Sequence, residues 1–122
     1  MKMVLTRDQI RERLKFKDVD IGTTRTKVFD AVVPERVKRN IVAIVLIADA
    51  TNRTVEIEKL EEDGTTYTMI FDDYNVAANS NAWIPPQYDL ERPIIVLEGG
   101  TNLYLKATAA IAGAVIYHDD EL

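Results

Sequence analysis

The sequence of 122 residues has no cysteine, one serine and one histidine. Without thiols the chain can form no disulfide, no thiolate nucleophile and no cysteine-ligated metal site. A single imidazole is too few for the usual histidine-based motifs, so we expect neither a metal nor another cofactor. A Ser-His-Asp site would have to join Ser80 to His118, and no nucleophile elbow surrounds the serine. We interpret His118, which lies beside two aspartates near the C-terminus, as a solvated side chain.

The chain also lacks an excess of positive charge and a long apolar run. Its net charge is −5, from 15 lysines and arginines against 20 aspartates and glutamates. Such a chain does not attract a phosphate backbone, so we expect no nucleic acid as the main partner. The longest wholly apolar run, residues 41–48, is too short to span a bilayer, and the N-terminus has no signal-peptide core. The sequence predicts a soluble protein without a membrane partner, and its scarcity of serine and glutamine favours a thermophilic source.

The start of the chain has the signals of a helix. Thr6 and Gln9 have the spacing of a capping box, and Leu5 and Ile10 have the spacing of a hydrophobic staple. The amphipathic pattern that follows predicts a helix of about three turns with a narrow apolar stripe. Turn residues then collect over residues 17–26, where we expect a linker.

The rest of the chain reads as strands. We predict that residues 1–26 form an N-terminal helix and linker arm, and that residues 27–122 form a β-sandwich domain. Eight segments carry strand patterns: 27–33, 40–48, 53–60, 61–73, 75–87, 92–100, 101–110 and 113–118. An Asp-Gly pair at residues 63–64 predicts a hairpin, and a Gly-Gly pair at residues 99–100 predicts another. The predicted fold class is all-β, an antiparallel and jelly-roll-like sandwich of about eight short strands with a short N-terminal helix.

Two of these strands, at residues 41–48 and 94–97, are apolar on both faces. One face of an antiparallel sandwich sheet normally meets water. Either the helix or a loop covers the second face, or the second face is a subunit interface. The outward set of the longer strand is either Val42, Ile44 and Leu46, or Ile41, Ala43, Val45 and Ile47. The candidate interface residues are Ile41, Ile44, Val45, Leu46, Ile47, Ile94, Ile95, Trp83, Ile10 and Leu14.

Two further groups could carry chemistry. Asp72 and Asp73 are paired acids, but neighbours on a strand point to opposite faces, so we expect them to be solvated rather than to share a site. Trp83, with Tyr74 and Tyr88, could stack on a sugar ring, although a tryptophan before Ile-Pro-Pro is more often a packing anchor. No catalytic residue is predicted.

The order of segments over roughly residues 31–117 resembles small β-sandwich virion proteins of tailed phages and related viruses. The segments that carry this resemblance are VVPERVKRNIVAIVLIADATNRTVEIEKL, DGTTYTMIF, NVAANSNAWI and PIIVLEGGTNLYLKATAA. They share a Val-Pro start, a polar Asn-x-Thr turn, an Ala-Asn before a strand, and a Leu-Glu-Gly-Gly stretch close to a recurring ending of that family.

The resemblance implies a non-enzymatic structural protein, as a head-decoration, fibre or tail-associated component. It implies a homo-oligomer, with a trimer expected, that binds other virion proteins. Its location would be the virion, after a soluble stage in the host cytoplasm. Two alternatives stay open: a carbohydrate-binding sandwich with an aromatic platform near Trp83, and a small sandwich-type hydrolase that brings His118 or two acids together in a pocket.

Overall fold

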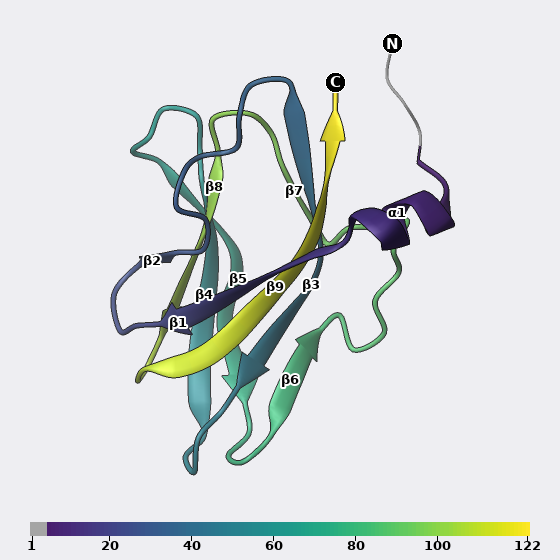
Figure 1. Ribbon diagram of the computed structural model, residues 1–122. Coiled ribbons are helices and arrows are strands. Elements are labelled where there is room, and N and C mark those ends of the chain that lie inside the picture. Colours follow the sequence, from purple (N-terminus) through teal and green to yellow (C-terminus); the bar gives the residue numbers. More distant parts are fainter. Residues whose placement is uncertain (1–4) are drawn as a thin grey trace.

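The computed structural model describes residues 5–122 as two packed antiparallel sheets with one short helix (Figure 1). In chain order the elements are α1 (Arg7–Arg13), β1 (Lys15–Ile21), β2 (Thr26–Lys27), β3 (Val37–Ile47), β4 (Arg53–Leu60), β5 (Tyr67–Val76), β6 (Asn81–Ile84), β7 (Ile95–Leu97), β8 (Asn102–Ala107) and β9 (Ile111–Glu121). One sheet has five strands in the order β1-β9-β3-β6, with β7 also paired to β3. The other has four, in the order β2-β8-β4-β5. The predicted all-β sandwich with an N-terminal helix is confirmed.

The helix α1 begins as the sequence predicts. The Thr6 side chain accepts a hydrogen bond from the Gln9 backbone at 3.2 Å, and the Gln9 side chain accepts one from the Thr6 backbone at 2.9 Å. This capping box satisfies donors that the first helical turn leaves free. The helix is shorter than expected, with seven residues, because the chain is already extended at Leu14 and enters β1. Among the described residues no helix has the length and apolar character of a membrane span.

The linker predicted over residues 17–26 is wrong for residues 17–21. This stretch belongs to β1, which pairs with β9 along its whole length. Val19 and Ile21 alternate with two aspartates and are buried in the main core. The alternating pattern is short, and the charged residues in it give this stretch the composition of a loop. A division of the chain into folding units at residue 26 stays a prediction.

The strand predicted over residues 27–33 is also wrong for most of its length. Only Thr26–Lys27 forms a strand, β2, and the following residues bend away. They remain attached to β8 and to the residue before it, by hydrogen bonds from Val28 to Leu103 and from Val33 to Thr101, both 2.9 Å. Val28, Phe29 and Val33 fill the core between the sheets. Their apolar character reflects this burial rather than regular strand pairing.

The hairpin predicted at 63–64 is present between β4 and β5, with Gly64 at a φ of 74°. The hairpin predicted at 99–100 is absent. Here β7 pairs with β3 in the five-stranded sheet, whereas β8 pairs with β2 and β4 in the other sheet. The Gly-Gly turn therefore carries the chain across the core. Gly100 has a φ of 86°, and a Cβ at Gly99 would lie 3.0 Å from backbone atoms of residues 34 and 35.

A β-bulge in β3 explains its uninterrupted apolar run. Ile41 pairs with Tyr117 and Ala43 with Ile116, so Val42 is an extra residue in the ladder. Ile41 and Ile44 consequently both face the main core, while Val42 and Ala43 form a second cluster with Ile10 of α1. The interpretation that the N-terminal helix covers the second face is correct for this half of the strand.

Candidate functional site

The outward side of the five-stranded sheet, here called the outer face, is the first candidate site. Residues opposite each other in an antiparallel pair share a face, so the strand pairings define its members. They are Phe16, Asp18 and Asp20 on β1, Ala112, Ala114 and Ile116 on β9, Ala43, Val45 and Ile47 on β3, and Asn81 and Trp83 on β6. Apolar residues occupy its centre, and both aspartates lie along its β1 side.

Part of this face is covered and part is bare. Figure 1 shows α1 over the end of the sheet where β1 begins, and Ile10 packs there on Ile116 of β9. Beyond the helix Phe16 is 68% exposed, Ile47 42% and Trp83 40%. The small alanine side chains of β9 lie between these residues, so a partner with a flat surface can come close to the sheet. Three large apolar side chains thus meet solvent on one side of the sandwich.

Seven of the ten predicted interface residues lie elsewhere. Five of them are buried inside the single chain and offer no surface to a partner: Ile10, Ile41, Ile44, Leu46 and Ile95. Ile94 and Leu14 are partly buried against the main core and the α1 cluster, respectively. Val45, at 9% exposure, and the more exposed Ile47 and Trp83 lie on the outer face. A role in an interface stays a prediction for these three.

Trp83 has an aromatic neighbour. Its ring stacks on that of Tyr88, with centroids 6.1 Å apart and an interplanar angle of 21°. Tyr88 is 49% exposed, so both rings meet solvent. Tyr74, the third predicted member, lies on β5 of the other sheet and contacts Phe71 instead. The aromatic platform therefore has two rings rather than three.

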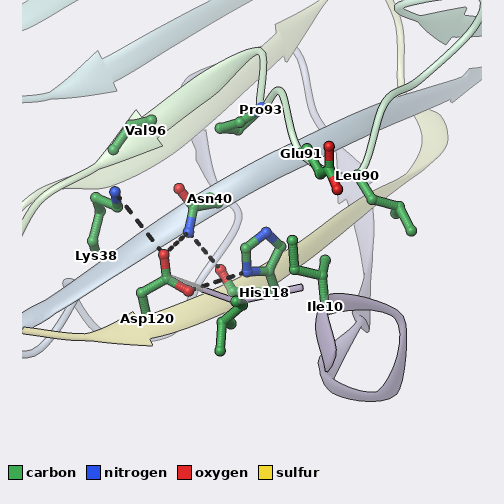
Figure 2. A pocket seen from close by; sticks show the side chains of 10 residues that line it. Ile10, Lys38, Asn40, Leu90, Glu91, Pro93, Val96, His118 and Asp120 are labelled. Carbon is green, nitrogen blue, oxygen red and sulfur yellow. Dashed lines mark hydrogen bonds and ion pairs between the residues drawn. The ribbon is translucent and has the colours of Figure 1, made fainter. Parts of the chain in front are cut away.

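The second candidate site is a cavity of about 490 Å³ beside α1. Its lining is apolar on one side and polar on the other: Leu5, Ile10, Leu90, Pro93 and Val96, then Lys38, Asn40, Glu91, His118 and Asp120. Figure 2 shows the imidazole of His118 between Asp120 and Ile10. The interpretation of His118 as a solvated side chain is wrong, because β9 continues to Glu121 and leaves the residue 4% exposed.

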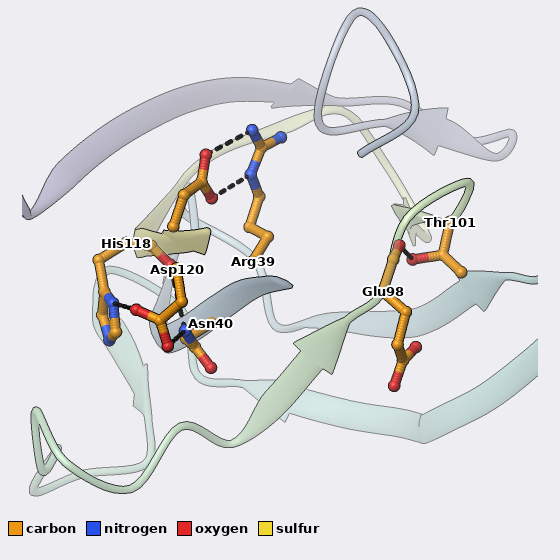
Figure 3. Close-up of polar contacts among 7 residues, drawn as sticks. Arg39, Asn40, Glu98, Thr101, His118 and Asp120 are labelled. Carbon is orange, nitrogen blue, oxygen red and sulfur yellow. Dashed lines mark hydrogen bonds and ion pairs between the residues drawn. The ribbon is translucent and has the colours of Figure 1, made fainter. Parts of the chain in front are cut away.

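The polar contacts in this cavity are incomplete. The Asn40 amide donates to Asp120 Oδ2 at 3.1 Å, and the Lys38 ammonium lies 3.9 Å from the same oxygen. His118 Nδ1 is 3.5 Å from Asp120 Oδ1 (Figure 3). Within the described part of the chain, neither ring nitrogen of His118 nor Asp120 Oδ1 has a hydrogen-bond partner. Buried polar atoms of this kind normally have one.

A Ser-His-Asp site is not formed. The carbonyl of Ser80 accepts from Ala48, just beyond the far end of β3, while His118 pairs with Asn40 near its start. At the rise of an extended strand these positions are roughly 25 Å apart. Ser80 Oγ instead donates to the Ala77 carbonyl at 2.7 Å.

The paired acids do come together, contrary to expectation. Carboxylate oxygens of Glu56, Asp72 and Asp73 all lie within 4.8 Å of one another. The cause is a register shift, in which Val55 pairs with Tyr74 and Ile57 with Phe71, so both aspartates lie opposite Glu56. Asp73 has a φ of 51° at this irregularity. Strict alternation does not apply there, and the side chains can share a side.

No protein-family model matches the chain, and no curated protein sequence matches it. Solved structures are similar. One is a protein of the disulfide-linked pili of Bacillus endospore appendages, with 15% identity and a TM-score of 0.52, covering 88% of this chain and 83% of that one. Another is the Dit protein (gp 19.1) of phage SPP1, from the hub adsorption apparatus of phages that infect Gram-positive bacteria. Its identity is 17% and its TM-score 0.45, and the match covers 93% of this chain but 49% of that protein. The likeness to the pilus protein supports the β-sandwich fold.

The polar group around His118 was missed by sequence reasoning. Lys38, Arg39 and Asn40 follow the first residue of β3, and they lie opposite Asp120, Asp119 and His118 near the end of β9. A basic tripeptide and an acidic one could have suggested this pairing. Nothing in the local pattern selects it over other charge combinations, because the two segments are about 80 residues apart.

Proposed function

We propose that this chain is a non-enzymatic structural or assembly protein of a virion, which acts through self-association and by binding other particle proteins. The observation that carries the proposal is the bare, apolar outer face of the five-stranded sheet. Exposed apolar patches with a polar rim commonly mark contacts between proteins. The resemblance to small virion sandwich proteins supplies the setting, a virion reached after a soluble stage in the host cytoplasm.

The outer face has the composition of an interface centre. Trp83 and Phe16 are large aromatic side chains of the kind that anchor protein contacts. Each square ångström of apolar surface removed from water contributes about 25 cal/mol, so covering this face favours association. The centre contains no charged side chain that a partner would have to desolvate.

The charges at the ends of this surface favour a second copy of the chain as its partner. Arg11 and Arg13 of α1 are exposed at one end, and Asp18 and Asp20 are exposed on β1 as it leads away from the helix. Two copies that face each other in opposite orientations place the arginines of one near the aspartates of the other. Such a self-complementary contact gives a dimer, whereas the resemblance implies three copies.

The fold is compatible with assembly. The similar pilus protein belongs to disulfide-linked pili, which shows that a sandwich of this kind occurs in an assembled fibre. This chain has no cysteine, so contacts between its copies have to be non-covalent.

The test compares two residues of β3. Ile47→Asp puts a charge on the outer face, where Ile47 is 42% exposed and association would leave the charge unpaired at a cost on the order of several kcal/mol. We expect a folded monomer. Ile44→Asp puts the same charge into the main core, and we expect loss of folding. Val32→Asp is the matched control, because Val32 is 47% exposed and lies outside the outer face.

Light scattering measures the mass of each variant, and circular dichroism measures its fold. The proposal requires an oligomer for the wild type and for Val32→Asp, and a monomer for Ile47→Asp. The measured mass also separates two copies from three. A monomeric wild type at high concentration, or an Ile47→Asp variant that keeps the wild-type mass, contradicts self-association through this face.

The pair of stacked rings favours carbohydrate binding as a second candidate function. Trp83 and Tyr88 together present an exposed aromatic platform, which is how many proteins stack on a sugar ring. Trp83 is the single tryptophan, so its fluorescence reports the platform directly. A saturable change in this fluorescence with an oligosaccharide, weakened in Tyr88→Ala without a change in mass, would support this candidate over self-association.

A further inference from the structure

We propose that the cavity around His118 binds an aliphatic ammonium group, either on a free amine or at the end of a lysine side chain. The proposal is independent of self-association, because the cavity lies beside α1 and its lining shares no residue with the bare part of the outer face. It explains why a buried imidazole and a buried carboxylate oxygen lack partners in the described chain.

The orientation of His118 determines what the cavity offers. Its Nδ1 faces Asp120 Oδ1 at 3.5 Å. A proton on Nδ1 turns this contact into an attraction, whereas a lone pair there would face a carboxylate. The neutral ring therefore carries its proton on Nδ1 and presents Nε2 as an acceptor. Figure 2 shows the second ring nitrogen directed toward the space bordered by Asn40, Pro93 and Glu91.

Acceptors outnumber donors in the cavity. His118 Nε2, Asp120 Oδ1 and the Glu91 carboxylate can each accept a hydrogen bond. The cation of the lining, Lys38, lies by the other oxygen of Asp120, which also accepts from Asn40. Arg7 lies outside the lining, and its guanidinium is 4.0 Å from the Glu91 carboxylate. Both side chains are more than half exposed. The lining therefore holds two carboxylates and one lysine, so one more positive charge would balance it.

The apolar half of the lining suits the rest of the ligand. Ile10, Leu90, Pro93 and Val96 are aliphatic, and the described lining contains no phenylalanine, tyrosine or tryptophan. An unbranched alkyl chain can lie against such a wall while its ammonium group reaches the acceptors, as lysine side chains do on protein surfaces. An ammonium group has three donors, and the lining offers three acceptors.

His118 provides a specific probe, because it is the one histidine of the chain and its imidazole C–H signals in NMR need no assignment. Titration with n-butylammonium chloride is expected to shift these signals saturably, with a dissociation constant of about 1 mM. Sodium butyrate, which has the same chain and the opposite charge, is expected to leave them unchanged. Nα-acetyl-lysine methylamide is the second ligand. If it binds more tightly than n-butylammonium, the ammonium group belongs to a protein side chain. If it binds more weakly, the group belongs to a free amine.

Variants locate the binding. Asp120→Asn removes a buried acceptor charge and should weaken n-butylammonium about tenfold. Since this change can also disturb β9, Glu91→Gln serves as a second variant, because Glu91 is at the mouth and its side chain is 54% exposed. It should weaken binding about twofold. Glu12→Gln is the matched control, an exposed residue of α1 outside the lining, and should bind like the wild type.

Three outcomes overturn the proposal. A saturable shift with butyrate and none with n-butylammonium makes this an anion site. No shift with either ligand means that the cavity holds only water. Equal affinity for n-butylammonium in the wild type and in both Asp120→Asn and Glu91→Gln places the binding elsewhere.

Discussion

Asp63 holds the turn between β4 and β5 through several hydrogen bonds to one carboxylate. The backbone N–H groups of Thr65 and Thr66 donate to its Oδ1 at 2.9 and 2.8 Å, and the Thr66 hydroxyl donates to Oδ2. The Thr66 hydroxyl, followed by these backbone groups, lowers the pKa of Asp63 to about 2. The ionised form is thus favoured by folding.

This lowered pKa predicts a pH dependence of stability. The folded pKa lies below the unfolded value, so the contribution of Asp63 is present above about pH 4 and is lost as the pH falls toward 2. Asp63→Asn should lower the melting temperature at pH 7 and flatten its fall between pH 4 and pH 2. Thermal unfolding of both proteins over this range measures the difference. Parallel curves for the two proteins would contradict the assignment.

Arg39 makes a largely buried ion pair with two parallel hydrogen bonds. Its guanidinium donates to both oxygens of Asp119, at 2.8 and 2.9 Å (Figure 3). The same group lies over the rings of Phe29 and Tyr117, at 4.4 and 4.9 Å from their centroids. The hydrogen bond to Asp119 raises the pKa of Arg39. The two side chains are 13% and 22% exposed, so solvent screens them only in part.

We therefore expect Arg39→Lys to be destabilising although it keeps the charge. Lysine cannot donate in the two-pronged geometry or stack flat on the rings. The expected loss in free energy of unfolding is roughly 1–2 kcal/mol, from the weaker charged hydrogen bonds and ring contacts. Urea denaturation measures it, with Arg53→Lys as a control in a more exposed pair. An effect no larger than that of the control would contradict the prediction.

At this scale the sequence predicts local contacts better than distant ones. The capping box of Thr6 and Gln9 depends on residues three apart, and the structure contains it. The burial of His118 depends on Lys38, Arg39 and Asn40, which neutralise and bind the aspartates that follow it. Without those partners the acidic C-terminal stretch has the composition of a solvated end.

At the scale of elements, hydrophobic patterns locate strands but not their sheets. β3, β4 and β8 lie where alternation or apolar runs predict them. The turn at Gly99-Gly100 has hairpin composition, yet a tight turn can also carry a chain from one sheet to the other. β1 was missed because its buried positions, Val19 and Ile21, are only two.

The position of β1 predicts different effects for two truncations. Deleting residues 1–14 removes α1 and uncovers Val42, Ala43 and Ile116, which should cost about 2–3 kcal/mol of stability but leave a folded chain. Deleting residues 1–26 also removes Val19 and Ile21 from the core, and we expect that chain not to fold. Circular dichroism and urea denaturation compare the two. If residues 27–122 fold as stably as residues 15–122, the division at residue 26 is correct and β1 is dispensable.

At the scale of the whole molecule, the proposed non-enzymatic role predicts how the polar groups behave. His118 and Asp120 form a pair, but the described residues that line their cavity include no serine or threonine that could act as nucleophile. Glu56, Asp72 and Asp73 lie at the surface, where the Lys106 ammonium is 3.7 Å from Glu56. Screening with ester, phosphoester and glycoside substrates should give no turnover. Activity that disappears in His118→Ala or Asp72→Ala would contradict this prediction.

The absence of cysteine gives a second prediction for the whole molecule. Assemblies of this chain can contain no disulfide between copies. Their mass should therefore be unchanged by a reducing agent and should fall with dilution, because apolar contacts obey mass action. Light scattering with and without reductant, over a range of concentrations, measures both. A mass that stays constant on dilution to nanomolar concentration would require a tighter contact than the bare part of the outer face suggests.

The extra residue in β3 also sets how this strand can be compared or redesigned. Up to Ile41 the odd-numbered side chains turn toward the main core, and from Ile44 onward the even-numbered ones do. A saturation library across β3 should therefore tolerate polar residues at even-numbered positions before Val42 and at odd-numbered positions after it. An alignment that follows alternation alone places one half of the strand a residue out of register, with its core and surface positions exchanged.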